Sequence, residues 1–381
     1  MTASDASCLL LSSQMASLSA TRERMAQLDI EIEKLQRLLD PLLAEREKCS
    51  QTVADFQYPV LTLPAEITSE IFMQFLPSYP ERPSLIGPQS PSLLLQICRK
   101  WRDVALTTPA LWSTMKLTLD SIYHVRQRHL LHVWLKRSGN RSLSMGLACS
   151  FGMADDDEIL IEFVDSLACY ATRWQEMEIV LPCESFRRIT GSMPRLRSVN
   201  IGSFWWEHPP ETPILLFTEA PALKNVVLSA TFNPLTITLP WLQITTLVAE
   251  ALSLDEAVEI LRQTTTLEHC TLTVDDGHPS AASLIPPLPL RSLTLRYRGH
   301  GVSTGMVARM FQLFAALNLP LLETLVVHES FLGPDPVGAL SRVCPNGYPR
   351  QIEIFSARTP REIYAGAFPL ASLSVHEESS V

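Results

Sequence analysis

A short apolar unit of the form L-x-x-[LVM]-x-[LIV] recurs along most of the chain. Apolar residues at alternate positions indicate β-strands with one buried face. From Leu196 onward, successive first positions lie from 19 residues apart, between Leu223 and Leu242, to 32 residues apart, between Leu290 and Leu322. These steps leave room for a strand and a returning segment. The units are at 196–201, 223–228, 267–272, 290–295 and 322–327, less regularly at 242–247, and with a leading Trp at 112–117 and 174–179.

Helical segments are predicted between the units, at 154–171, 254–263 and 303–317. The first two open with acidic residues, which suit the positive end of a helix dipole. Strands that alternate with helices of this length indicate parallel pairing, so the fold class predicted for this part of the chain is α/β. The polar segment 356–381 is predicted to be a disordered tail.

The repeated unit resembles degenerate leucine-rich repeats. The resemblance implies an irregular solenoid of parallel strands and helices over 118–355. The alternative is an ordinary α/β domain whose strands share a Pro-x-Leu start. An irregular curve is expected because the repeat's usual Asn or Cys, three residues after the last apolar position, is replaced by Phe204, Thr231, Glu250, Asp275, Arg298 and Ser330.

Two short amphipathic helices are predicted ahead of the repeats. The segment 61–77 (LTLPAEITSEIFMQFLP) predicts a helix that Pro77 ends, and 92–106 predicts a second helix. Helices this short cannot bury both apolar faces against each other, so the surplus apolar surface is expected to meet a partner.

LPAEITSEIFMQFLP followed by ICRKWRDVALTTPALW is similar to an F-box, the all-α module that docks a substrate receptor onto the Skp-type adaptor of a cullin–RING ubiquitin ligase. The resemblance covers 58–117. The Pro- and Ser-rich insertion at 78–92 departs from it, so we expect a short or displaced middle helix and a mobile loop. The adaptor-binding residues that the resemblance implies are Leu63, Pro64, Ile67, Ile71, Phe72, Leu76, Ile97, Cys98, Trp101 and Trp112.

The function implied is that of a non-catalytic substrate receptor of an SCF-type E3 ubiquitin ligase, with the repeats holding a protein substrate. On the repeat strands, residues that alternate with the core positions face outward. The alternative function is an interaction scaffold outside any ligase. The outward residues proposed for a substrate face are Asn200, Val227, Ser229, Thr271, Thr273, Thr294, Arg296, Val326 and His328.

Residues 1–17 are predicted to be disordered, and 18–57 to form a helix. A heptad runs through 18–50, with apolar a and d positions from Met25 to Leu42, which is typical of a coiled coil. Pro41 is expected to bend or break this helix. The helix either dimerises with a second copy or folds back on the helices that follow.

Composition excludes several other classes of protein. Hydrophobic residues make up 46% of the 381 residues and charged residues 19%, which is globular composition. A net charge of −9 argues against nucleic acid or an anionic membrane as the main partner. Eight scattered cysteines without CxxC spacing favour the cytosol or nucleus and give no support for a zinc site.

No active-site motif is found, so no catalysis, cofactor or metal is predicted. The acidic run 155–158 suits a helix N-terminus better than a calcium loop. His124, His129 and His132 lack a third ligand at metal-binding spacing. The turn 299–305 fails the spacing of a dinucleotide fingerprint, and a helix cap at Ser303 or Thr304 explains it.

Overall fold

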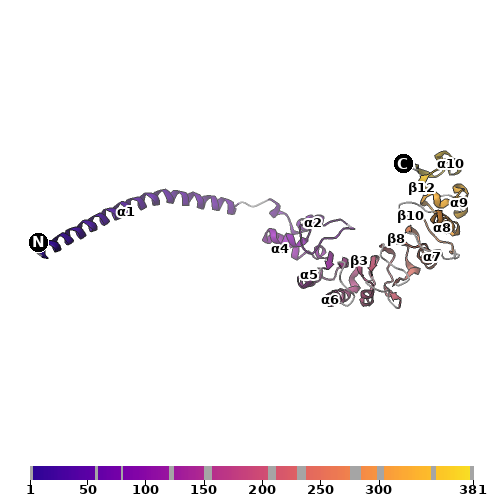
Figure 1. Ribbon diagram of the computed structural model, residues 1–381, viewed down its shortest axis with the longest axis horizontal. Coiled ribbons are helices and arrows are strands. Elements are labelled where there is room, and N and C mark those ends of the chain that lie inside the picture. The colour runs from indigo at the N-terminus through magenta and orange to yellow at the C-terminus, as the bar shows by residue number, and fades with distance from the viewer. Residues whose placement is uncertain are drawn as a thin grey trace. The chain divides into compact units, whose positions relative to one another are not determined.

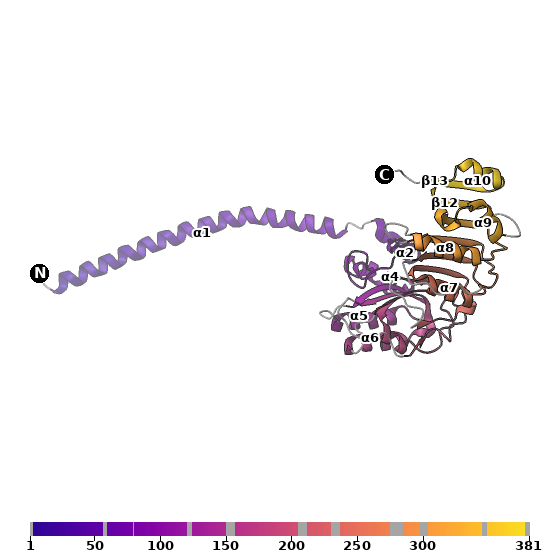
Figure 2. The ribbon, with the colours of Figure 1, turned by 45° about the vertical axis from the view of Figure 1, so that its right-hand side comes forward.

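The computed structural model is a mixed α/β protein with a long N-terminal helix and a large parallel sheet (Figures 1 and 2). It divides into two compact units, 1–67 and 68–381, which are described separately. The structure describes residues 3–55, 59–78, 80–119, 124–149, 157–204, 212–229, 237–274, 285–297, 304–344 and 349–377.

The first unit consists mainly of α1 (Ala3–Asp55), followed by the 3₁₀ turn η1 (Pro59–Thr62). The prediction of disorder over 1–17 is therefore wrong from Ala3 onward. That segment contains neither Pro nor Gly to stop a helix, and it is rich in Ala, Ser and Leu. Pro41 lies inside α1 without ending it. Every side chain from Ser17 to Asp55 is exposed.

The second unit is built on an eleven-stranded sheet in which every neighbouring pair is parallel. Its strand order, β1-β2-β3-β4-β6-β8-β9-β10-β11-β12-β13, follows the chain, and β5 (Ile214–Leu215) and β7 (Ile237–Thr238) form a separate pair. All eight predicted units lead into strands. The main strands are β1 (Thr114–Leu119), β2 (Leu143–Cys149), β3 (Trp174–Pro182), β4 (Ser198–Phe204), β6 (Asn225–Leu228), β8 (Thr246–Leu252), β9 (His269–Val274), β10 (Ser292–Tyr297), β11 (Thr324–His328), β12 (Gln351–Ala357) and β13 (Ser372–Glu377).

In the described part of the chain, helices cover one face of the sheet, and the opposite face is called the open face below. Figure 1 shows the helices α5 to α10 along the outer side of the strands. Alternate strand residues are buried beneath these helices in one continuous core, as Cys270, Leu272 and Val274 of β9 illustrate. The helices are α5 (His124–Arg137), α6 (Glu158–Ala168), α7 (Leu254–Gln263), α8 (Thr304–Ala316), α9 (Pro336–Val343) and α10 (Arg361–Ala367).

The C-terminal segment corrects a second prediction of disorder. Within 356–381, the described residues to 377 include α10 and β13, and both Tyr364 and Phe368 are buried. The cause is one more copy of the repeated unit, at Leu370-Ala-Ser-Leu373-Ser-Val375. It pairs β13 with β12 and extends the sheet by one strand.

The second of the two short helices before the sheet differs from expectation. The first is α2 (Ala65–Phe75), as predicted. The predicted helix at 92–106 is split into α3 (Leu94–Ile97) and α4 (Arg99–Leu106). The break lies at Cys98, whose backbone is extended and whose Sγ accepts a bond from the Trp101 N–H at 3.5 Å. The turn is held by Arg102 Nε, which donates to the Leu95 carbonyl at 2.8 Å.

The Pro- and Ser-rich insertion at 78–92, expected to be a mobile loop, is attached to the first edge of the sheet. Ser84 forms a parallel bridge with Lys116 of β1, and the Lys116 N–H donates to the Pro83 carbonyl at 2.7 Å. Leu85 is buried. Arg82 reaches the open face of β2 and β3, where it donates to Ser144 Oγ at 3.1 Å and pairs with Glu178 at 2.9 Å.

We expect Arg82→Ala to lower the free energy of unfolding by about 1–2 kcal/mol, because the Arg82 side chain is only 5% exposed and bonds a carboxylate. Urea denaturation measures the loss, and limited proteolysis should show faster cleavage within 78–92. The matched control is Arg291→Ala, whose pair with Glu323 at 2.7 Å is about half exposed and should contribute no more than about 0.5 kcal/mol. Equal effects of the two substitutions would contradict the attachment.

Candidate functional site

Four of the ten predicted adaptor-binding side chains are exposed. Ile71 of α2 is 46% exposed and Ile97 of α3 is 53% exposed, and Pro64 and Ile67 are exposed as well. Leu63, Leu76, Cys98 and Trp101 are half-buried. Isoleucines exposed to this extent, on helices that bury other side chains in the core, provide apolar surface for a second molecule.

Two predicted adaptor-binding residues lie inside the protein instead of on its surface. Phe72 and Trp112 are 1% and 0% exposed, so neither can contact a partner. Phe72 packs edge-on against Trp101, with ring centroids 5.0 Å apart, and this pair joins α2 to α4. Both residues belong to the apolar core.

Trp112 joins the short helices to the sheet layer. It ends the 3₁₀ turn η3 (Pro109–Trp112), and its Nε1 donates to the Ala105 carbonyl of α4 at 2.9 Å. Its ring packs edge-on against Trp134 of α5 at 5.2 Å, and the Arg137 guanidinium lies 4.5 Å from its centroid. Trp112 is therefore an anchor inside the protein.

Leu93 and Leu106 are exposed residues that the prediction omitted. They are 38% and 40% exposed, at the start of α3 and the end of α4. Leu93 precedes Ile97 by four residues, so the two lie on one side of that helical turn. This i, i+4 spacing is the signal in the sequence that could have identified Leu93.

The strand register brings most of the predicted substrate-face residues into one row across the open face. Asn200 is opposite Val227, and Thr271 is opposite Thr294, which is opposite Val326. Val248 of β8 completes the row between Val227 and Thr271. The row continues to Glu178, Gly146 and Lys116 on one side and to Glu353 and Ser374 on the other.

The remaining predicted residues lie nearer the carboxyl ends of the strands. Thr273 is opposite Arg296, which is exposed, whereas Ser229 and His328 are half-buried. The Asn200 Oδ1 is buried and has no hydrogen-bond partner within the described ranges. A face with apolar, hydroxyl and amide groups in its central row suits contact and hydrogen bonding more than bond-making chemistry.

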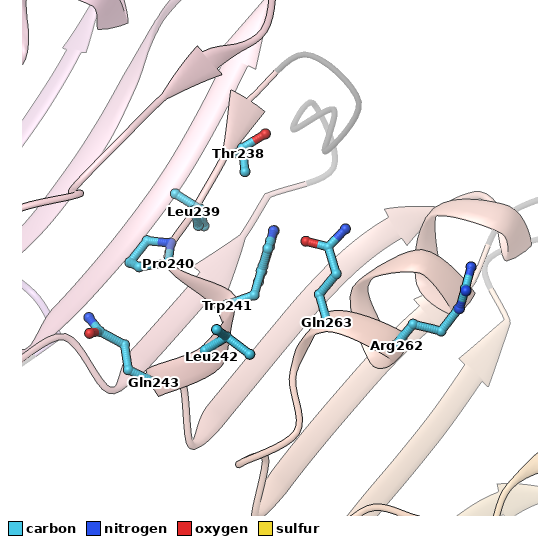
Figure 3. Close-up of a pocket in the computed structure, with 8 residues that line it drawn as sticks. All are labelled: Thr238, Leu239, Pro240, Trp241, Leu242, Gln243, Arg262 and Gln263. Carbon is cyan, nitrogen blue, oxygen red and sulfur yellow. The ribbon is translucent and has the colours of Figure 1, made fainter. Parts of the chain in front are cut away.

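A pocket of about 620 Å³ lies on the helical side of the sheet, between the turn η6 (Trp241–Gln243) and the end of α7. Figure 3 shows Trp241 facing Gln263 across it. Gln243 donates to the Ala220 carbonyl at 2.7 Å, and Gln263 donates to Glu259 at 2.7 Å. The amide groups of both glutamines that line the pocket thus donate hydrogen bonds to other groups of this chain. The lining residues are Thr238, Leu239, Pro240, Trp241, Leu242, Gln243, Arg262 and Gln263.

A second pocket, of about 640 Å³, lies at the ends of β11 and β12. His328 Nδ1 is 2.7 Å from Ser330 Oγ, which resembles a nucleophile beside its base. The same nitrogen also accepts from the Ser330 N–H at 3.3 Å, so the imidazole caps the turn η7 (Glu329–Leu332). Glu329 is buried and occupied by bonds from Arg358, Thr359 and Tyr364. These bonds hold the segment after β11 to the segment after β12 beside the pocket.

The other motifs have structural roles where the structure describes them. Asp157 caps α6, its Oδ1 accepting from the Ile159 N–H at 2.9 Å, while residues 155 and 156 lie outside the described ranges. The glycine-rich turn also lies outside them up to residue 303. His129 and His132 are exposed on α5. No group of three His, Cys, Asp or Glu side chains among the described residues is arranged to hold a metal.

Buried cysteines behave as small apolar residues. Burial raises the pKa of the Cys270 thiol to about 12 and that of Cys344 to about 11, so neither forms a thiolate readily.

Comparison with models of known protein families matches none of them, and comparison with curated proteins gives no match either. Among the helices of the described ranges, none is both long enough and apolar enough to cross a bilayer.

Proposed function

We propose that this chain is a substrate receptor of an SCF-type E3 ubiquitin ligase. In this proposal α2, α3 and α4 dock a Skp-type adaptor, and the open face of the sheet holds a protein substrate. The chain itself carries out no chemistry, and it contributes by positioning the substrate for ubiquitin transfer by other subunits.

The observation that carries the proposal is the exposure of Ile71 and Ile97. They lie within a sequence that resembles an F-box, on helices that also contribute Phe72 and Leu94 to the core. Burying an exposed isoleucine is worth about 1.5–3 kcal/mol, so a few such residues can supply much of a docking energy.

We expect Ile71→Asp combined with Ile97→Asp to abolish co-purification of a Skp-type adaptor with the full chain, because each aspartate would be buried unpaired at the interface. Both positions are exposed, so the melting temperature should stay within a few degrees of the wild type. The matched control is Ile86→Asp, a 51% exposed isoleucine of the insertion, which should retain the adaptor. Retention by the double variant, or no adaptor on the wild type, would reject the proposal.

We further infer that the second unit is an irregular leucine-rich-repeat-like solenoid. Support comes from its chain-ordered parallel strands with helices on one face. Where the repeat's usual Asn or Cys would lie, Glu250 is exposed and Ser330 instead bonds His328. A substrate on the open face would meet the row from Asn200 to Val326.

An interaction scaffold outside any ligase is the second candidate. The observation that favours it is α1, whose apolar a and d positions are exposed throughout. The two functions differ in the co-purification experiment, because a scaffold needs no Skp-type adaptor.

A further inference from the structure

We propose that α1 forms a parallel, in-register two-stranded coiled coil with α1 of a second copy of this chain. The helix has 53 residues, which corresponds to a length of about 80 Å. Isolated helices gain little stability in water without packing against an apolar face, yet every α1 side chain from Ser17 to Asp55 is exposed in the single chain. The inference does not rest on the proposed ligase function.

The seam is defined by the a and d positions of the heptad. Met25, Ile32 and Leu39 occupy a, and Leu28, Leu35 and Leu42 occupy d. All six are between 40% and 61% exposed. A β-branched residue at a central a position with leucine at each d position suits two parallel strands. Pro41 is at position c, away from the seam, so it removes no seam contact.

The flanking positions indicate that the partner is a second copy. In a parallel pair, position g faces position e of the partner's following heptad. In-register pairing sets Arg24 against Asp29 and Leu38 against Leu43, each twice, and no like charges face each other at these positions between residues 17 and 50. The chain is thus complementary to itself in charge at the e and g positions and in apolar surface from Met25 to Leu42, whereas beyond this seam the two Arg46 side chains meet at an a position.

Antiparallel pairing matches these positions less well. If Ile32 packs against Leu35 of an antiparallel copy, Arg24 faces Glu45, but Leu38 faces Glu31 and Leu43 faces Arg22, so two apolar side chains meet charged ones. Parallel pairing also brings Cys49, an exposed free thiol at a d position, next to Cys49 of the other copy.

The test compares two isoleucines of α1 that are two residues apart. We expect the wild-type chain to show twice its 42.6 kDa mass by light scattering after size-exclusion chromatography. Ile32→Asp, at the seam, should raise the dimer dissociation constant at least about 100-fold, since it buries two unpaired carboxylates. Ile30→Asp, at the outer f position and 69% exposed, is the matched control and should remain dimeric.

Mild oxidation then tests the direction of pairing. Wild type should form a disulfide-linked dimer on non-reducing gels, and Cys49→Ser should not. Arg24→Glu should weaken the dimer about tenfold, and adding Asp29→Arg should restore it. A monomeric wild type, a dimer that survives Ile32→Asp, or an oxidised dimer that does not depend on Cys49 would each overturn the proposal.

Discussion

Replacing Trp112 with alanine is expected to destabilise the second unit by about 3–5 kcal/mol, the usual cost of removing a fully buried tryptophan. The substitution removes the bond to the Ala105 carbonyl, the edge-on contact with Trp134 and the surface beneath Arg137. It also leaves a cavity where η3, α4 and α5 meet. Urea denaturation monitored by circular dichroism gives the change in unfolding free energy.

Leu106→Ala is the control for Trp112→Ala. Leu106 ends α4 and is 40% exposed, so its loss should cost no more than about 0.5 kcal/mol. A double-mutant cycle with Trp134→Ala should show a coupling of about 0.5–1.5 kcal/mol for the aromatic pair. A loss below about 1 kcal/mol for Trp112→Ala would contradict its role as an anchor.

The contact between Phe72 and Trp101 explains why the exposed residues of α2 to α4 could be only partly predicted. Ile71 and Phe72 are adjacent and both apolar, so a single sequence does not reveal which of them faces the core. The answer depends on Trp101, 29 positions after Phe72, which packs against it. The resemblance predicts an adaptor-binding surface on α2 to α4, but it does not separate the exposed side chains of these helices from the buried ones.

The strands were predictable because each unit carries its own signal. Alternating apolar residues mark β4 at Val199 and Ile201 and β9 at Cys270 and Leu272, whatever the rest of the chain does. Three strands of the eleven-stranded sheet were not predicted. The unit of β12 begins with Pro349 in place of leucine, and β2 lacks the full unit. β13 carries the unit but lies in a segment that was predicted to be disordered because it is polar.

Contacts between distant residues could not be predicted. Arg82 and Glu178 are 96 residues apart, and no local pattern in the sequence indicates that they pair. Their pairing depends on β1, β2 and β3 lying in register, with Gly146 leaving room between Lys116 and Glu178. The insertion therefore looked like a free loop until the sheet edge that it covers was known.

These distant contacts also determine how α2–α4 are connected to the open face. Trp112 and Arg82 attach the segment to the sheet at two places, one in the core and one at the edge. If the proposed function holds, these attachments keep a bound adaptor at a constant distance from a bound substrate. Ubiquitin transfer benefits from such positioning, because a fixed approach lowers the entropic cost of bringing the reactants together.

Glu329→Gln should lower the stability of the last two strands by about 2 kcal/mol at neutral pH. The Glu329 carboxylate accepts bonds from the backbone N–H groups of Arg358 and Thr359, the latter at 3.0 Å, and from Tyr364 OH at 2.6 Å. It thereby holds the end of β11 to the segment between β12 and α10. An amide can accept only some of these bonds, and its own NH₂ group opposes the remaining donors. Hydrogen exchange should show reduced protection in α10 and β13.

The contribution should depend on pH in a defined direction. Burial alone would raise the pKa of Glu329, but the bonds from Arg358, Thr359 and Tyr364 outweigh burial and lower it. A carboxyl with a lowered pKa stabilises the fold above the unfolded value of about 4.3, and this stabilisation is lost as the pH falls through the lowered folded pKa. The difference between wild type and Glu329→Gln should therefore be largest above about pH 5 and shrink on acidification. Glu353→Gln, whose contact with His376 is exposed, is the control and should show a smaller difference at neutral pH. A difference for Glu329→Gln that stays constant down to the acid transition would show that the carboxylate charge does not hold these loops together.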